Sequence, residues 1–225
     1  MRFAIFVALA LLACVCLSPR ASAIVGGEPD ASSGTQALVR VGICSGLLVA
    51  SDVVLTAAHC DNGFIVWRDA TGASYAVNKQ VRMTAPLGAD LALLKLATPV
   101  AASVEPALLS AKVPWLADRV SVVGFGQAVP GKESSAGALR SATLYVREPL
   151  INDGLTVWAD NGGAAGACKG DSGGALRLGT AVIGIVTSIL GPCGTVTIAV
   201  LLGPQREWID QTLAAWGRTT RWKGP

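Results

Sequence analysis

Short apolar runs separated by turn-forming residues dominate the chain after residue 23. Runs of β-branched and aliphatic residues, bounded by Gly, Pro, Asn and Asp, are typical of an all-β barrel or sandwich. Residues 97–115 are richer in Ala, Pro and Ser, which favours a connector between two halves. We predict strands that include 37–43, 47–49, 53–56, 64–67, 91–96, 120–123, 142–146 and 181–186.

One helix is predicted, near the C-terminal end. Pro204 suits the first position of a helix. Ile209, Leu213 and Trp216 recur at intervals of four and three residues, which places them on one helical face. We expect this helix, over about 204–216, to pack against the second half of the chain.

The first 23 residues have a different pattern. Arg2 precedes an apolar run over 3–17, which is shorter than the roughly 20 residues that span a membrane. Small residues at 21–23 follow, and this order is typical of a secretory signal peptide. We predict that 1–23 is removed and that 24–225 has no membrane contact. The alternative is a lipoprotein modified at Cys14, but Leu12 fits the lipid-attachment motif badly.

The composition of 24–225 argues against several functions. Without the two arginines of the signal, 16 basic and 15 acidic side chains remain. This nearly neutral balance argues against a nucleic-acid-binding protein, which would need an excess of basic residues. The chain has a single histidine and no Cys-x-x-Cys pair after the signal, which argues against zinc, and we expect no metal or other cofactor. In an exported chain an even number of cysteines indicates disulfides, here two with three possible connectivities. The four cysteines are Cys44, Cys60, Cys168 and Cys193.

Three short stretches contain the candidate chemistry: LTAAHC at 55–60, ADLALLKL at 89–96 and CKGDSGG at 168–174. Each has an ordinary structural interpretation, since His59 could be a structural histidine, Asp90 a turn residue and the glycines a tight turn. Together they offer the base, orienting carboxylate and hydroxyl nucleophile that a serine hydrolase requires.

These stretches, in the order His, Asp, Ser, resemble the trypsin/chymotrypsin family of serine proteases. The resemblance runs from Ile24 to the terminal helix, and VGFG at 123–126 resembles a turn in the family's second barrel. It implies an all-β fold of two antiparallel six-stranded barrels, over about 24–110 and 111–203, followed by the helix. The active-site cleft would lie between the barrels.

The resemblance also assigns roles. His59 would be the general base, Asp90 its orienting partner and Ser172 the nucleophile. The backbone N–H groups of Gly170 and Ser172 would form the oxyanion hole. The implied disulfides are Cys44–Cys60 and Cys168–Cys193.

The segment Ile24-Val25-Gly26-Gly27 carries a further implication. In the family, the ammonium of a new terminus at this Ile pairs with the aspartate before the serine, here Asp171. Ala23 is also the predicted last residue of the signal, so we expect export and activation to be one event. The ordinary alternative is that Ile24 merely begins a strand.

The resemblance places the specificity pocket around Gly166, six residues before the serine. No acidic residue lies within 164–169, which argues against a preference for Arg or Lys. Ile189 would project into the pocket and Ala199 would narrow its other wall, so we expect a shallow pocket for small aliphatic residues. A slip of one or two residues would place Gly191 there instead. Thr187 and Ser188 complete the predicted wall.

The leading hypothesis is a monomeric, secreted or periplasmic endopeptidase that cuts protein or peptide substrates through an acyl-enzyme. The second is a non-catalytic or regulatory binding protein on the same fold, because a fold does not determine function. An esterase of another fold is disfavoured, because Ser172 lies in Gly-Asp-Ser-Gly-Gly and not in a Gly-x-Ser-x-Gly elbow.

Overall fold

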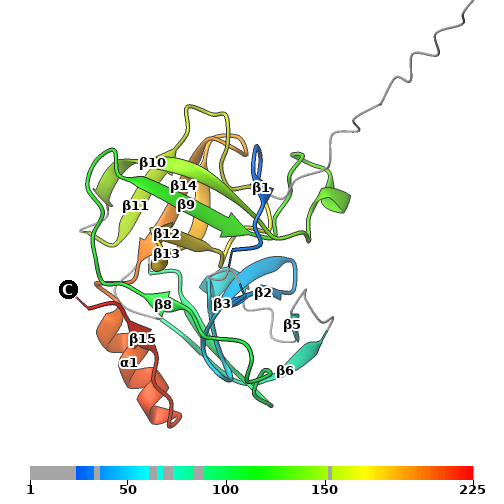
Figure 1. Cartoon of the computed structure of the whole chain (residues 1–225), viewed down its shortest axis with the longest axis vertical. Helices are drawn as coiled ribbons and strands as arrows, with labels where there is room; N and C mark the ends of the chain where they lie inside the picture. The colour runs from blue at the N-terminus through cyan, green and yellow to red at the C-terminus, as the bar shows by residue number, and fades with distance from the viewer. Residues whose placement is uncertain are drawn as a thin grey trace, which may run out of the picture.

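The computed structural model describes residues 24–32, 36–60, 65–67, 73–83, 89–151 and 154–224. Within these residues, the strands form two groups, and one α-helix lies beside them near the C-terminus (Figure 1). This confirms the predicted all-β class with a terminal helix. The predicted signal peptide, 1–23, lies outside the described residues.

The first group of strands is a closed barrel with the order β2-β3-β4-β7-β6-β5 and antiparallel pairing throughout. Both faces of β3 and β4 are buried, which explains why apolar runs predicted them. β6 was not predicted, because its side chains are partly or fully exposed and polar residues interrupt its apolar pattern. The strands are β2 (Leu38–Val41), β3 (Cys44–Ala50), β4 (Val53–Thr56), β5 (Ile65–Trp67), β6 (Ser74–Arg82) and β7 (Ala92–Leu96).

The second group runs in the order β12-β9-β10-β11-β14-β13, and β12 also pairs with β13, so that six strands form a closed ring of pairings. Val122, Leu144 and Ile183 are fully buried in the cluster that fills it. These strands are β9 (Arg119–Gly124), β10 (Arg140–Ile151), β11 (Thr156–Asp160), β12 (Ala175–Leu178), β13 (Ala181–Leu190) and β14 (Val196–Leu201).

Three short strands extend the second group. β1 (Glu28–Pro29) pairs with β10, while β8 (Leu108–Leu109) pairs in parallel with β13 and with β15 (Arg221–Trp222). Among the described residues, the 3-10 turns η2 (Ala58–Cys60) and η3 (Glu133–Ser135) lie in connections. η2 follows β4 directly, which places a turn with His59 at one end of the first barrel.

Helix α1 (Arg206–Ala215) buries Ile209 and Leu213 in a core cluster that also contains residues of both strand groups. It begins two residues after Pro204 because the Gln205 N–H donates to Leu202 O, which makes the proline part of a turn. In Figure 1, α1 and β15 lie together beside β8. Within the described residues, no helix is long and apolar enough to cross a membrane.

The C-terminal segment is tied to the first barrel by an ion pair between a partly exposed arginine and a buried aspartate. The guanidinium of Arg218 donates to both carboxylate oxygens of Asp52, at 2.7 and 2.8 Å. Asp52 is buried in the turn between β3 and β4, and the Lys95 Nζ lies 3.7 Å from its Oδ2. Lys95 also donates to the carbonyl of Trp216, which follows α1. The helix and the barrel are therefore held together by polar contacts as well as by apolar packing.

Candidate active site

His59 and Asp90 meet because neighbouring strands carry them. η2 with His59 follows β4, Asp90 precedes β7, and Thr56 lies opposite Ala92 where the two strands pair. Asp90 Oδ2 lies 2.6 Å from His59 Nδ1, and Asp90 Oδ1 accepts the His59 backbone N–H at 3.0 Å. A proton on Nδ1 shared with the carboxylate leaves Nε2 free to accept another proton. The arrangement therefore fixes both the position and the tautomer of the imidazole.

Ser172 lies in a tight turn between the Cys168–Cys193 disulfide and β12. The Asp171 N–H donates to Cys168 O at 3.0 Å, and the Gly174 N–H donates to Asp171 O at 2.8 Å. Gly170 has a φ of 98°, and a side chain there would put its Cβ 2.9 Å from Ile43 O. Both the left-handed backbone and the close approach require glycine.

The first barrel holds this turn in place. The Ser45 N–H donates to Ser172 O at 2.8 Å, and the Ser45 hydroxyl donates to Gly170 O at 2.9 Å. Cys60, next to His59, has its Sγ 3.7 Å from Ser172 O. The serine and the histidine are thus brought to the same junction between the barrels. The Ser172 hydroxyl itself donates to Thr187 O at 3.3 Å, and no His59–Ser172 hydrogen bond occurs in the described part of the chain.

Two backbone N–H groups of this turn are available. In the part of the chain that the structure describes, the N–H groups of Asp171, Gly173 and Gly174 all donate to carbonyls, whereas those of Gly170 and Ser172 have no acceptor. Free donors on either side of one peptide unit can bind one anionic oxygen. These two N–H groups are therefore available to an anionic oxygen beside the serine hydroxyl.

Both disulfides form, in the pairs that the resemblance implies. Cys44 and Cys60 have a Cα–Cα distance of 5.9 Å, and Cys168 and Cys193 one of 4.6 Å. Cys44, His59 and Cys60 have potential metal-ligating atoms within 4.8 Å of one another. Because both sulfurs belong to a disulfide, neither can supply the thiolate that zinc needs.

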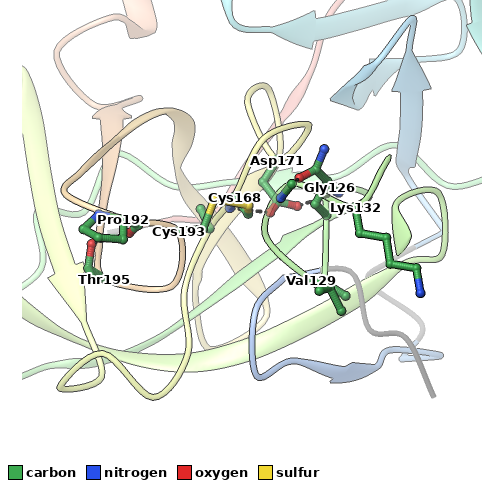
Figure 2. The surroundings of a disulfide bond; sticks show 12 residues. Gly126, Val129, Lys132, Cys168, Asp171, Pro192, Cys193 and Thr195 are labelled. Atoms are coloured by element: carbon green, nitrogen blue, oxygen red, sulfur yellow. Dashed lines mark hydrogen bonds between the residues drawn. A yellow bond between two sulfur atoms is a disulfide. The ribbon is translucent and has the colours of Figure 1, made fainter. Parts of the chain in front are cut away.

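Asp171 is the most deeply buried carboxyl group of the site. Its Oδ1 accepts the Gly126 N–H and its Oδ2 accepts the Cys168 N–H, both at 2.8 Å. Figure 2 shows Asp171 and Gly126 on one side of the Cys168–Cys193 disulfide. Burial raises the pKa of Asp171 to about 7, although the two backbone donors favour the charged form. A Cβ at Gly126 would lie 2.5 Å from the carboxylate carbon, which explains the glycine in VGFG.

Ile24 is fully buried in the second strand group and has a φ of 57°. Its carbonyl accepts the Gly27 N–H at 2.8 Å, and Val25 forms a bridge with Gly166. For a β-branched residue a positive φ is a genuine outlier. The described contacts do not include a bond between Ile24 and Asp171.

The predicted pocket residues lie where β13 and β14 pair. Ile189 is opposite Thr197, two positions before Ala199 on the same strand. Thr197 is buried, and its Oγ1 accepts the Ala167 N–H at 3.0 Å. Ala199 lies deeper, fully buried between Val157 and Val186. The sequence did not reveal Thr197, because only the strand register shows which residue faces Ile189.

Glycine is required at position 166. A Cβ there would lie 2.9 Å from Thr195 O and 3.0 Å from the Gly194 carbonyl carbon. The backbone of 194–195 therefore occupies the space that a side chain at Gly166 would need. Gly191 lies in the turn after β13 with a φ of 87°, so Ile189 and not Gly191 belongs to the paired strand.

Thr187 and Ser188 differ in their placement. The register of β13 against β14 shifts between Val186 and Ser188, which leaves Thr187 in a bulge. Its carbonyl accepts the Ser172 hydroxyl, and Ser188 is exposed. The bulge thus places the wall of the predicted pocket in direct contact with the candidate nucleophile.

Comparisons with known proteins agree with this geometry. Residues 24–209 match the family model described as Trypsin. The mouse protein kallikrein 1-related peptidase b11 is 27% identical over 253 residues, which span 93% of this chain and 97% of that protein. Platelet-aggregating proteinase PA-BJ of Bothrops jararaca is also 27% identical, over 76% of this chain and 85% of its own.

Solved structures show the same fold. Neuropsin, a serine protease expressed in the limbic system of mouse brain, has a TM-score of 0.73 at 22% identity, covering 84% of this chain and 99% of its own. A mutant of human heparin binding protein also has a TM-score of 0.73, at 23% identity, with 85% and 97% covered. With the family model matched from Ile24 into α1, the chain belongs to the trypsin family of serine proteases.

Proposed function

We propose that the protein is a secreted serine endopeptidase that hydrolyses peptide bonds through an acyl-enzyme. The observation that carries this proposal is the imidazole of His59, which Asp90 holds by its backbone N–H and by Nδ1 beside the Ser172 turn. Serine is a weak nucleophile, and a fixed neutral imidazole is the base that activates it. A binding protein would have no need of this paired imidazole.

In the proposed reaction, the Ser172 hydroxyl turns from Thr187 O toward His59 Nε2. Apo geometries of this kind commonly tighten only when substrate binds. Oγ attacks the scissile carbonyl carbon while Nε2 takes its proton, and the Asp90 carboxylate stabilises the imidazolium. The N–H groups of Gly170 and Ser172 bind the developing oxyanion, each typically contributing about 3 kcal/mol.

The intermediate then collapses. His59 returns its proton to the leaving nitrogen as the C–N bond breaks, which releases an amine and leaves an ester on Ser172. Water attacks this ester with His59 again as base, and the proton on Nε2 returns to Oγ as the acid product leaves. Each proton taken by the imidazole is thus returned within the same half-reaction, and no cofactor is required.

The pocket favours small aliphatic residues before the scissile bond. The backbone of 194–195 fills the space beside Gly166, and Ile189 and Thr197 face one another across the strand pair. Side chains directly opposite in an antiparallel pair lie close together, with Cβ atoms about 5 Å apart. These contacts leave little depth for an aromatic or basic side chain.

Removal of residues 1–23 would also activate the protein. Cleavage before Ile24 creates an ammonium on the residue that precedes Val25, which forms the bridge with Gly166. Leaving a buried carboxylate such as Asp171 unpaired costs several kcal/mol, so that ammonium has a reason to bind there. The two disulfides support an oxidising destination.

The test is digestion of a mixed peptide library by the protein that starts at Ile24, with Ser172→Ala as the matched control. We expect cuts after Ala or Val that disappear in the variant. If the wild-type protein cuts nothing although its terminus is confirmed by mass spectrometry, the binding-protein hypothesis replaces the proposal.

A further inference from the structure

A cavity of about 230 Å³ lies against the Ser172 turn, on the side of the first barrel. Gly170, whose N–H is one of the two free donors, forms part of its wall. Ile43, from the hairpin between β2 and β3, forms another part, and its carbonyl approaches Gly170 closely. The cavity therefore begins where the scissile carbonyl would be held.

The position of this cavity identifies the part of a substrate that would enter it. Thr187 and Ile189 lie on one side of Ser172, and this wall would receive the residues before the scissile bond. The peptide beyond the bond must leave in the other direction, toward Ile43 and the Cys44–Cys60 disulfide. Since an extended chain advances about 3.5 Å per residue, one of the first two residues beyond the bond would reach the cavity.

The lining of the cavity carries more positive than negative side chains. Arg40, on β2, and Lys169, just before Gly170, contribute two cations, and Glu133 of η3 contributes the one acid among the lining residues. In the described part of the chain, none of these three forms an ion pair. A side chain at Gly137 would place its Cβ 3.3 Å from Arg40 Nη1. The guanidinium therefore lies close to the loop that follows η3.

The uncharged residues of the lining do not offset this excess of positive charge. Gln127 is buried, its Oε1 accepts the Gly131 N–H at 2.9 Å, and its backbone N–H donates to Lys169 O. The acceptor oxygen of this side chain is therefore already bonded within its own loop. Because the lining has two unpaired cations and one exposed acid, the cavity favours the binding of a carboxylate. Arg binds carboxylates with directional, charge-assisted hydrogen bonds.

We propose that the Arg40 and Lys169 cavity binds an acidic side chain of the substrate, within two residues after the scissile bond. The protein would then select peptides by both sides of the bond: a small residue before it and Asp or Glu shortly after it. This inference rests on the proposed peptidase function and deepens it.

The experiment uses internally quenched peptides that share Ala before the scissile bond and carry Glu, Gln or Lys at the first or second position beyond it. An exposed ion pair contributes up to about 1 kcal/mol, so kcat/KM should be about fivefold higher with Glu than with Gln, and lowest with Lys. Because Lys169 and Glu133 are exposed and Arg40 is partly exposed, the preference should weaken as salt rises.

Three variants make the test specific. Arg40→Gln should bring the Glu and Gln peptides to within twofold, and Arg40→Glu should turn the preference toward Lys. Glu133→Gln should increase the preference for Glu. Arg119→Gln is the matched control, because Arg119 is an exposed arginine at the far end of β9 and should leave the preference unchanged.

A second substrate separates the two proposals. An Ala anilide has no residue beyond its scissile bond, so all four variants should hydrolyse it at the wild-type rate, which also reports that they are folded. Normal anilide hydrolysis with no preference for Glu, or a preference that survives Arg40→Gln, would overturn the cavity inference alone. No hydrolysis of any substrate by the wild-type protein would overturn the proposed function and this inference with it.

Discussion

Because Asp171 is buried, we expect the free energy of unfolding to depend on pH differently when the chain begins at Ile24. The comparison is between two forms of the Ser172→Ala protein, which cannot digest itself. One form begins at Ile24, and the other carries one extra alanine before it. The extra residue keeps a terminal charge but moves it away from the position that cleavage before Ile24 creates.

The raised pKa of Asp171 sets the direction and the size of the expected pH effect on stability. Asp171 has a pKa of about 7 in the fold and a usual value of 3.8, so between these values the unfolded chain ionises while the folded one keeps its proton. The contribution of Asp171 to stability is therefore fully present below about pH 4 and is lost as pH rises to 7. About three pKa units at 1.36 kcal/mol each amount to roughly 4 kcal/mol.

The ammonium of Ile24 should offset this loss in the form that begins there. Urea unfolding at pH 4.5 and pH 7, followed by tryptophan fluorescence, measures the difference; an upper value is roughly 4 kcal/mol in favour of the Ile24 form at pH 7. Asp171→Asn should remove the difference in pH dependence between the two forms. The same pH dependence in both Asp171 forms would refute the pairing of Ile24 with Asp171.

Three further substitutions, one of them with a matched control, test the site and the fold. Asp90→Asn should lower kcat by roughly 10³- to 10⁴-fold with little change in KM, because the imidazole loses its fixed tautomer; a loss below tenfold in steady-state kinetics would argue against that role. Ile189→Gly should open the pocket and shift peptide cleavage from Ala and Val toward Phe and Leu, and an unchanged cleavage profile would show that Ile189 does not line it. Arg218→Ala should lower the Tm in thermal unfolding because it leaves the buried Asp52 with Lys95 alone. Arg221→Ala, which breaks the exposed pair with Glu105, should change the Tm much less, and equal effects would contradict the importance of burial.

Much of the first barrel could be predicted from its apolar runs. β3, β4 and β7 are almost wholly buried, so their sequences are nearly continuous in apolar residues. β6 escaped prediction because Asn78, Lys79 and Gln80 are exposed on it and hide the alternation. A strand is recognisable from its sequence to the extent that burial dictates its residues.

The candidate site could be predicted in its residues but not in its contacts. The motifs name His59, Asp90 and Ser172, yet the contact of the Ser172 hydroxyl with Thr187 O depends on a bulge in β13. Thr197 faces Ile189 only through the register of two strands. Nothing local in the sequence places Arg40 and Lys169 at one cavity, because the fold brings them together from opposite barrels.

The proposed function requires His59 to activate Ser172 as a nucleophile. The most direct measurement is the intact mass of the Ile24 form after exposure to diisopropyl fluorophosphate, with peptide mapping of the adduct. We expect one adduct, on Ser172, that is lost in Ser172→Ala and forms far more slowly in His59→Ala. No adduct, or an adduct that forms equally fast without His59, would contradict it.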